Sequence, residues 1–282
     1  MDVDVGIVAQ RNNTRAHDLA RTLIETLERD YEGVTAVVDE ATGHAEAIER
    51  AGVPVAEMRG YDLVISIGGD GTLLFVAREV GGTPILGVNL GEVGFLNAVA
   101  PENAREEVID LVDHLEATGS LEGRQLDRLQ AQSADEEWTL EPALNEVVVH
   151  GPRRGHGGGA TLEIAVNGQQ YGSGHADGVL VATPTGSTAY NLSEGGPLVH
   201  PGADALILTQ MAADDGMRPL VVDTDTEITL TVSDAETAYA ISDGRDRRHL
   251  EPPTTVTVTV ADEPVTLVGP QANFVDGLEK LE

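Results

Sequence analysis

Two short polar runs contain the residues best suited to chemistry in this chain. The first, Gly68-Gly69-Asp70-Gly71-Thr72, follows an apolar stretch of strand length. Its glycines permit φ > 0 and let phosphate oxygens reach backbone N–H groups, because no Cβ is in the way. Asp70 repels phosphates, so we predict another role for it: accepting a proton from a hydroxyl, or helping to hold Mg²⁺ on the phosphates. The alternative is a solvated aspartate in a tight turn between strand and helix.

The second run is typical of a strand, a turn and the start of a helix. It is Asp177-Gly178-Val179-Leu180-Val181-Ala182-Thr183-Pro184-Thr185-Gly186-Ser187-Thr188-Ala189-Tyr190. Pro184 and Gly186 favour a turn, and Ser187 and Thr188 are expected as N-caps. The ring of Tyr190 suits a ribose or a base. The alternative is an ordinary capped helix.

A polar pair, Asn145-Glu146, interrupts an otherwise apolar strand. Burying such a pair costs stability unless it finds partners. An amide and a carboxylate can hold the vicinal hydroxyls of a ribose, whereas the alternative is an exposed edge strand. The two polar runs together predict a nucleotide-handling kinase in which Asp70 acts on a hydroxyl.

The motifs of several other enzyme classes are missing from the sequence. There is no G-x-x-x-x-G-K-[ST] run, and Lys280 is the only lysine, so a P-loop is excluded. No G-x-G-x-x-G run follows the first strand, and no G-x-S-x-G elbow occurs. The absence of cysteine excludes disulfides, thiolate metal sites and cysteine nucleophiles.

The composition is strongly acidic. The 282 residues include 48 acidic and 17 basic side chains, for a formal net charge of −31. Such a chain repels nucleic acid and anionic membranes, and it is similar to halophile proteins adapted to molar salt, where the Debye length is about 3 Å. The N-terminus lacks a signal-peptide pattern, and no apolar run has membrane-spanning length. We therefore expect a cytoplasmic protein without nucleic-acid or membrane partners.

The pattern along the chain predicts an α/β domain followed by a β-rich domain. In the first part, strands are expected at 3–9, 34–38, 63–67 and 84–88, and helices at 14–30, 72–80 and from 101 to Gly119. Their continuous Val/Ile runs fit a parallel sheet buried on both faces. Short strands are then expected at 140–150, 160–166, 178–182, 206–211, 227–232, 255–260 and 264–268. Asn167-Gly168 favours a hairpin.

We place the α/β domain at 1–122 and 262–282 and the β-rich domain at 123–261. A short helix at 273–282 is expected to return to the first domain.

Four motifs, in order along the chain, resemble those of the NAD kinase family. They are Gly68-Gly69-Asp70-Gly71-Thr72, Asn89-Leu90-Gly91-Glu92-Val93-Gly94-Phe95-Leu96, Asn145-Glu146 and the run from Asp177 to Tyr190. Arg218-Pro219-Leu220-Val221-Val222 and Ser242-Asp243-Gly244-Arg245 are also similar. Diacylglycerol- and sphingosine-type lipid kinases share the first motif, so the resemblance depends on the combination.

The resemblance implies transfer of the terminal phosphoryl group of ATP, or of polyphosphate, to the 2′-hydroxyl of the adenosine ribose of NAD, giving NADP. It implies that Mg²⁺ arrives on the donor, with no metal site of the protein's own, and that Asp70 is catalytic. The coenzyme-binding residues that it implies are Gly68, Gly69, Gly71, Thr72, Phe95, Asn145, Glu146, Asp177, Thr188, Ala189, Tyr190 and Ser193. It makes 123–261 the NAD-binding domain.

Within that set, the resemblance places Phe95 near the adenine and Asp177 on the nicotinamide ribose, while Asn145 and Glu146 hold groups on the adenosine side. It also implies a homodimer or homotetramer in which a neighbouring subunit borders the site. Arg78, in the helix after the glycine loop, is the nearest cation expected to assist the phosphates.

The chain departs from the family pattern at 210–217, where the expected proline and histidine are missing. Two alternatives stay open: a lipid kinase of the diacylglycerol type, which the negative charge disfavours, and a non-catalytic sensor of NAD(H) or NADP(H).

Overall fold

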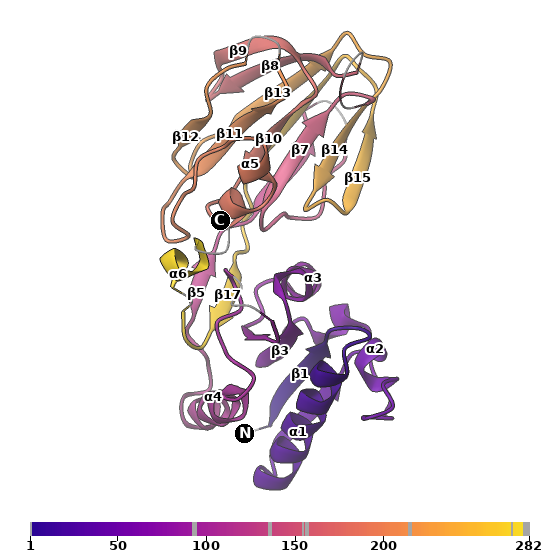
Figure 1. Cartoon of the computed structure of the whole chain (residues 1–282), viewed down its shortest axis with the longest axis vertical. Coiled ribbons are helices and arrows are strands. Elements are labelled where there is room, and N and C mark those ends of the chain that lie inside the picture. The colour runs from indigo at the N-terminus through magenta and orange to yellow at the C-terminus, as the bar shows by residue number, and fades with distance from the viewer. Residues whose placement is uncertain are drawn as a thin grey trace. The chain divides into compact units, whose positions relative to one another are not determined.

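The computed structural model describes residues 2–91, 95–134, 137–153, 155, 158–213, 216–271 and 273–278. The chain divides into two compact units (Figure 1). Unit 1 comprises Met1–Leu126 and Glu263–Glu282, and unit 2 comprises Asp127–Asp262. Unit 1 is an α/β unit with a parallel sheet and unit 2 is β-rich, which confirms the predicted fold class.

Unit 1 is built on a sheet of strand order β2-β1-β3-β4-β17-β5. The first five strands run parallel and β5 pairs antiparallel to β17. Their bounds are β1 Val3–Ala9, β2 Val34–Val38, β3 Leu63–Gly68, β4 Ile85–Asn89, β5 Arg124–Leu126 and β17 Val265–Val268. Every residue of β3 is buried, as expected for a strand covered on both faces.

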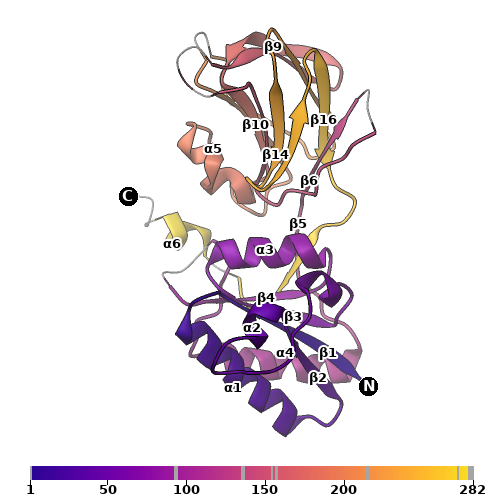
Figure 2. The same cartoon turned by 90° about the vertical axis from the view of Figure 1, so that its right-hand side faces the viewer.

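Helices cover both faces of this sheet. Helices α1 (Thr14–Asp30) and α4 (Ala104–Thr118) lie on one face, where Leu23 and Val108 join the same core, and α3 (Asp70–Val80) lies on the other (Figure 2). Helix α4 ends where predicted, at Gly119 with φ +80°. Shorter helical turns are α2 (Glu40–Gly43) and η1 (Val55–Met58).

The C-terminal segment returns to unit 1, as predicted. After β17, helix α6 (Phe274–Leu278) begins, and the side chain of Asn273 accepts a hydrogen bond from the backbone N–H of Val275 (3.1 Å). The rest of the helix expected at 273–282 lies outside the described residues. Among the helices of the described chain, none combines the length and the apolar character needed to cross a membrane.

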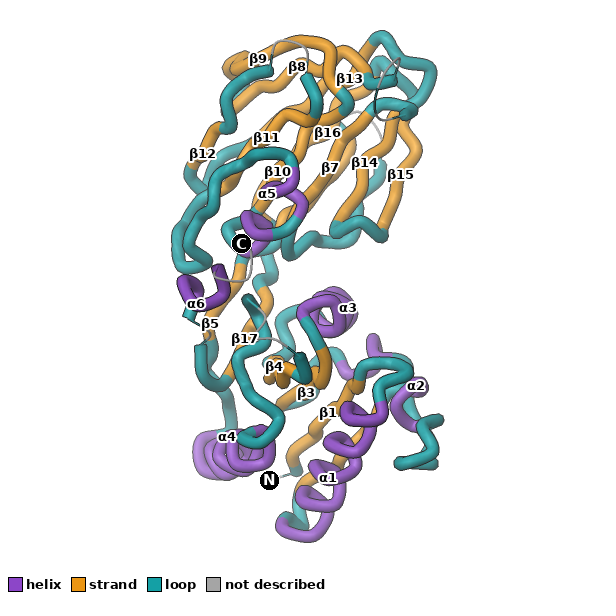
Figure 3. The backbone as a smooth tube through the Cα atoms, in the orientation of Figure 1, coloured by secondary structure: helices purple, strands orange, loops and turns teal. Residues whose placement is uncertain are grey.

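Unit 2 consists of two antiparallel sheets that enclose one apolar core (Figure 3). One sheet has the order β12-β11-β10-β7-β14-β15 and the other β6-β16-β13-β8-β9. Their strands are β6 Leu129–Ser133, β7 Glu146–His150, β8 Ala160–Val166, β9 Gln169–Ala176, β10 Gly178–Ala182, β11 Leu206–Met211, β12 Leu220–Val222, β13 Ile228–Ser233, β14 Ala238–Ser242, β15 Asp246–Leu250 and β16 Thr254–Val260. Helical turns η2 (Thr185–Thr188) and α5 (Tyr190–Ser193) follow β10.

Several predicted boundaries change in the structure. The expected strand 140–150 begins only at Glu146, because the N–H groups of Leu144 and Asn145 bond to the side chain of Asp243 instead of a neighbouring strand. Strands β5, β6, β9, β12, β14 and β15 were not among the expected strands. The Asn167-Gly168 hairpin is confirmed, with both residues at positive φ (49° and 75°) between β8 and β9.

Candidate active site

Asp70 stands where β3 ends and α3 begins, two residues earlier than the predicted helix start. Gly68, Gly69 and Gly71 all keep φ outside the left-handed region, so the expected positive φ is not used. What these glycines supply is space. A Cβ on Gly68 would collide with Thr72, whereas a Cβ on Gly69 or Gly71 would meet nothing within 4 Å. A ligand can therefore approach the backbone at Gly69 and Gly71.

Three consecutive backbone N–H groups hold the carboxylate of Asp70. Phe95 donates to Oδ2 (3.0 Å), and Leu96 and Asn97 donate to Oδ1 (3.4 and 3.3 Å). These donors follow strand β4, so the bonds tie the glycine loop to the loop after the neighbouring strand. Charge-assisted bonds of this kind fix the direction of a carboxylate. Within the predicted motif at 89–96, Glu92, Val93 and Gly94 lie outside the described residues.

Asn97 connects the same parts through its side chain. It is 1% exposed, and its Nδ2 donates to the carbonyl oxygen of Gly68 (3.3 Å). A Cβ on Gly87 would collide with Asn97 Oδ1 and lie 3.2 Å from its Cα, so Asn97 packs onto bare backbone of β4. Neither Asn97 nor Gly87 is predicted from the sequence, since an asparagine and a strand glycine are common and carry no distinct signal.

A hollow of about 480 Å³ lies next to Asn97, at the carboxyl end of β4. It is lined by Arg15, Asn89, Leu90, Gly91, Asn97, Ala98, Val99, Ala100, Pro101 and Glu102. Arg15 comes from the first turn of α1, and its guanidinium donates to the carbonyl oxygen of Leu90 (3.4 Å). Ligands of α/β sheets bind at the carboxyl ends of the strands, and this volume falls in the range of ligand pockets.

Arg78, the cation expected to assist the phosphates, is engaged elsewhere. It lies in the last turn of α3, and Glu79 Oε1 accepts hydrogen bonds from its Nη2 (2.8 Å) and Nε (3.2 Å). The structure therefore favours Arg15 over Arg78 as the arginine available to an anionic ligand of unit 1.

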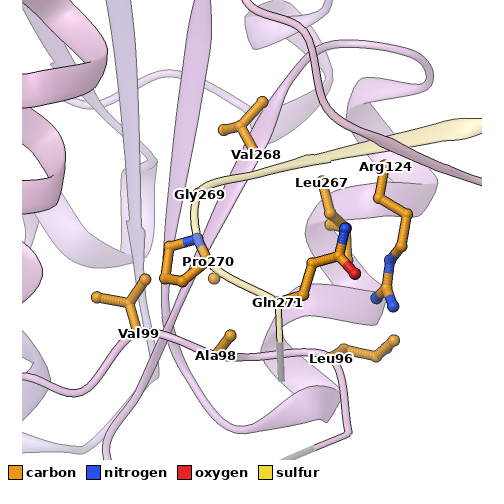
Figure 4. A pocket seen from close by; sticks show the side chains of 10 residues that line it. Leu96, Ala98, Val99, Arg124, Leu267, Val268, Gly269, Pro270 and Gln271 are labelled. Carbon is orange, nitrogen blue, oxygen red and sulfur yellow. The ribbon is translucent and has the colours of Figure 1, made fainter. Parts of the chain in front are cut away.

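A much smaller cavity is lined in part by Leu96, one of the residues whose N–H groups hold Asp70 (Figure 4). Its lining comprises Gly87, Leu96, Ala98, Val99, Arg124, Leu267, Val268, Gly269, Pro270 and Gln271. Its volume of about 10 Å³ admits about one water molecule, so it is no coenzyme site. Burial lowers the pKa of Arg124, and its Nε finds no hydrogen-bond partner in the described part of the chain.

In unit 2, the pair Asn145-Glu146 lies at the start of β7, a central strand between β10 and β14. The exposed-edge alternative is therefore wrong. Glu146 is 8% exposed, and its Oε2 has no hydrogen-bond partner among the described residues. Burial and the negative charge of Asp243 raise the pKa of Glu146 to about 7, while a hydrogen bond from the backbone N–H of Tyr190 lowers it. A buried acceptor oxygen of this kind can take a hydrogen bond from a ligand hydroxyl or amine.

The second polar run joins Asn145 through its turn. Thr183 donates its Oγ1 proton to the carbonyl oxygen of Leu144 (2.6 Å), and its backbone N–H donates to that of Asn145 (2.9 Å). A Cβ on Gly186 would lie 2.6 Å from the carbonyl carbon of Asn145, so only glycine allows this close approach.

The predicted N-caps are wrong. Ser187 Oγ donates to the carbonyl oxygen of Val199 (3.0 Å), and Thr188 Oγ1 donates to that of Thr185 (3.4 Å), so neither accepts the N–H bond that defines an N-cap. Helix α5 starts at Tyr190 without a side-chain cap. Tyr190 and Ala189 are partly buried next to the pair, and Ser193 is the exposed last residue of α5.

Asp177 lies at the other end of these strands. Its carbonyl oxygen accepts a hydrogen bond from Gly151, and its Oδ2 accepts one from Gly155 (2.6 Å). Glu146, by contrast, pairs with Ala182 at the far end of β10. The structure thus brings together Asn145, Glu146 and the 183–190 run. Five residues of extended chain, about 17 Å at about 3.4 Å per residue, separate Asp177 from Ala182, the partner of Glu146. No group of three or more His, Asp or Glu side chains suited to a metal ion occurs in the described ranges.

The chain is similar to known proteins along most of its length. Residues 5–115 match the model of the ATP-NAD kinase N-terminal domain, and residues 144–269 match that of the ATP-NAD kinase C-terminal domain. The chain is 56% identical to an NAD kinase of Haloarcula marismortui, covering 98% of this chain and 99% of the relative. It is 51% identical to an NAD kinase of Halobacterium salinarum, covering 99% of each.

Solved structures share the fold. The yeast NADH kinase complexed with NADH matches with a TM-score of 0.83 and 23% identity over 99% of this chain and 87% of that one. An NAD kinase from Archaeoglobus fulgidus in complex with ATP matches with a TM-score of 0.77 and 24% identity, over 99% of this chain and 98% of that one.

Proposed function

The chain belongs to the NAD kinase family, and on that premise we propose that Asp70 is the catalytic residue. A kinase of this family transfers the terminal phosphoryl group of ATP to the 2′-hydroxyl of the adenosine ribose of NAD, and the product is NADP. The observation that carries the proposal is the carboxylate of Asp70, held in one direction by three backbone N–H groups beside the open backbone of Gly69 and Gly71.

In the proposed mechanism, Asp70 accepts a hydrogen bond from the 2′-hydroxyl and takes its proton as the oxygen attacks the terminal phosphorus in line. The bond from that phosphorus to the bridging oxygen of the donor breaks, and ADP leaves. Phosphoryl transfer depends mostly on positioning and charge stabilisation. The open N–H groups at Gly69 and Gly71 and the positive end of α3 supply part of that stabilisation, and Arg15 supplies more from the hollow next to Asn97.

A divalent cation fits this arrangement as a companion of the donor. Mg²⁺ in kinases is held through one or two carboxylates together with substrate phosphates, and Asp70 offers one partly exposed carboxylate. When bound, the cation neutralises charge on the donor phosphates.

The coenzyme-binding set divides between the units. In unit 1 we assign Gly68, Gly69, Gly71, Thr72 and Phe95. In unit 2 we assign Asn145, Glu146, Asp177, Thr188, Ala189, Tyr190 and Ser193. The contacts between the turn at 183–186 and Asn145, together with the bare Oε2 of Glu146, support the adenosine-side assignment.

We further propose that the protein is a homodimer or homotetramer and that Asp177 serves the site of a neighbouring subunit. The support is its position, since Asp177 and Glu146 lie at opposite ends of the same pair of strands. The carboxylate assigned to the nicotinamide ribose and the pair assigned to the adenosine side are thus separated by the length of β10 within one subunit.

We also assign the enzyme to a cytoplasm of molar salt. The formal net charge of −31 and the similarity to enzymes of Haloarcula and Halobacterium support this setting. High salt screens the mutual repulsion of acidic side chains, so assays belong in concentrated KCl.

The central experiment measures NADP formation in concentrated KCl with Mg²⁺, NAD and ATP, detected with an NADP-specific dehydrogenase. We expect Asp70→Asn to bind NAD nearly normally and to lose at least about a thousandfold in kcat. Asp62→Asn is the matched control, because Asp62 also accepts a backbone N–H (from Asp4, 2.8 Å) but precedes β3 at its opposite end. Unchanged turnover in Asp70→Asn would remove Asp70 from the chemistry.

The same assay with polyphosphate in place of ATP decides the range of donors. Tight NAD binding without product under any salt and metal condition would instead support a sensor of NAD.

A mixing experiment tests the trans role of Asp177. Asp70→Asn and Asp177→Asn are each expected to be nearly inactive alone, but hybrids contain some sites with both native aspartates. Activity should therefore return when the two variants are unfolded, mixed and refolded together. Failure to recover activity, with both variants still oligomeric, would refute the trans assignment.

A further inference from the structure

One carboxylate in unit 2 holds the backbone on which the Asn145-Glu146 pair is built. Asp243 lies in the turn between β14 and β15. Its Oδ2 accepts the N–H of Leu144 (2.7 Å), and its Oδ1 accepts those of Asn145 (2.8 Å) and Glu146 (3.1 Å). The N–H of Asp243 donates in return to the carbonyl oxygen of Glu146 (3.0 Å).

The carbonyl groups of the same segment are bound from the other side. Thr183 donates to the carbonyl oxygens of Leu144 and Asn145. The backbone that leads into β7 is thus fixed by Asp243 through its N–H groups and by Thr183 through its oxygens. Buried backbone groups satisfied in this way leave the side chains of Asn145 and Glu146 for a ligand.

The charge of Asp243 acts on the same carboxyl group. Glu146 is buried, its Oε2 has no partner in the described chain, and Asp243 is the charged group that faces it. The other polar group that faces it is the backbone N–H of Tyr190, and its ladder partner on β10 is uncharged Ala182.

We propose that Asp243 is a positioning residue for coenzyme binding: it holds the backbone of Asn145 and Glu146 in the binding geometry. This inference rests on the proposed function, in which that pair binds the adenosine side of NAD.

Binding of the coenzyme is coupled to the protonation of Glu146. Burial and the charge of Asp243 raise the pKa of Glu146 to about 7, so the empty site holds a proton in a large share of molecules near neutral pH. Hydroxyl and amine donors of the coenzyme need acceptor oxygens, which the ionised carboxylate supplies. Binding of NAD therefore releases the proton of Glu146 to solvent, and affinity rises with pH until Glu146 is ionised in the free enzyme.

The test is calorimetry of NAD binding to the full-length enzyme in concentrated KCl, in two buffers of different ionisation enthalpy, at about pH 6.5. Asp243→Asn retains a residue that tolerates left-handed backbone (φ +44° at Asp243) but removes the charge and one strong acceptor. We expect NAD affinity to fall about tenfold and proton release to decrease, because Glu146 loses its anionic neighbour. In kinetics, KM for NAD rises about tenfold while kcat changes less than about threefold.

Asp234→Asn is the matched control. Asp234 is an exposed aspartate of the same unit in the same left-handed conformation (φ +52°), and no backbone hydrogen bond to its carboxylate occurs among the described residues. Its variant should match the wild type in affinity and proton release.

Two results would overturn the proposal: affinity in Asp243→Asn equal to that of Asp234→Asn, or unchanged proton release. If Asp243→Asn does not fold, Glu146→Gln decides, because it leaves the amide bonds in place. This variant should bind NAD without the wild-type proton release, and equal release would refute the proposal. A wild type that binds NAD but forms no NADP would fail the proposed function, yet the calorimetry would still decide on Asp243.

Discussion

Asp70 in unit 1 and Asp243 in unit 2 use the same device, a carboxylate that accepts three consecutive backbone N–H groups. At Asp70 the bonds measure 3.0 to 3.4 Å and the donors belong to a loop. At Asp243 they measure 2.7 to 3.1 Å and the donors lead into a central strand. At Asp243 the two shortest bonds come from Leu144 and Asn145, which precede the strand, and the longest comes from Glu146, its first residue.

The two carboxylates have opposite roles: Asp70 is the group that is held, whereas Asp243 holds other residues. In unit 1 the anchored carboxylate is the candidate catalyst, and the loop at 95–97 holds it beside open glycine backbone. In unit 2 the carboxylate is the anchor, and the residues that it holds, Asn145 and Glu146, are the candidate binding groups. Damage to the first device should lower kcat, whereas damage to the second should raise KM for NAD.

Among the variants that compare the two sites, the largest expected effects come from replacing a glycine that packs against each held segment with alanine. In Gly87→Ala, the new Cβ would collide with Asn97 Oδ1 and lie 2.8 Å from Leu73 Cδ1, which displaces the loop that holds Asp70. We expect kcat to fall about a hundredfold with KM for NAD nearly unchanged, in addition to an overpacking cost of about 1–3 kcal/mol in the free energy of unfolding.

In Gly186→Ala, the new Cβ would meet the backbone of Asn145, so KM for NAD should rise about a hundredfold and kcat should change less. Gly82→Ala is the control, since the three atoms nearest to its Cβ would all belong to the flexible side chain of Glu263. Steady-state kinetics in concentrated KCl separate the two patterns. If both glycine variants lowered kcat alike, the division of labour between the devices would be wrong.

The two devices also differ in how far the sequence could predict them. The glycine context singled out Asp70, and a polar pair in an apolar strand singled out Asn145 and Glu146. The groups that hold them are backbone N–H groups, which every residue except proline carries, so no residue type marks the donors. Asp243 accepts N–H groups from residues 97 to 99 positions earlier, and only the fold brings them together.

The fold shows the same limit. Continuous Val/Ile runs predicted the buried parallel strands of unit 1, because burial on both faces requires apolar residues throughout. Strand β15 (Asp246–Leu250) has three consecutive exposed residues at an edge of its sheet and was missed, because its sequence carries little of that signal.

The next prediction concerns the pH dependence of the free energy of unfolding, to which the raised pKa of Glu146 contributes. A carboxyl group whose pKa is raised on folding favours the folded state most at low pH, and this contribution is lost as pH rises from its ordinary value of 4.5 to about 7. Glutamine does not ionise, so Glu146→Gln does not lose stability through this titration as the pH rises. Between about pH 5 and pH 8, its free energy of unfolding should gain about 2 kcal/mol relative to the wild type.

Urea denaturation at fixed KCl concentration measures this difference at each pH, and taking the difference from the wild type cancels the titration of the other acidic groups. A difference that stays constant with pH would mean that Glu146 is ionised in the folded protein across this range.

The smallest expected effect tests whether helix α6 helps to hold Phe95, one of the three residues that donate to Asp70. The ring of Phe274 lies 5.9 Å from that of Phe95, whose N–H donates to Asp70. An aromatic pair contributes about 1 kcal/mol, so Phe274→Ala should lower kcat about fivefold and leave KM for NAD unchanged. Val275→Ala on the same helix is the control, because Val275 is 65% exposed. Phe274→Tyr should keep the ring contact and most of the activity. Equal kinetics in Phe274→Ala and Val275→Ala would show that Phe95 holds Asp70 without help from α6, and the device would then be confined to the glycine loop and the 95–97 segment.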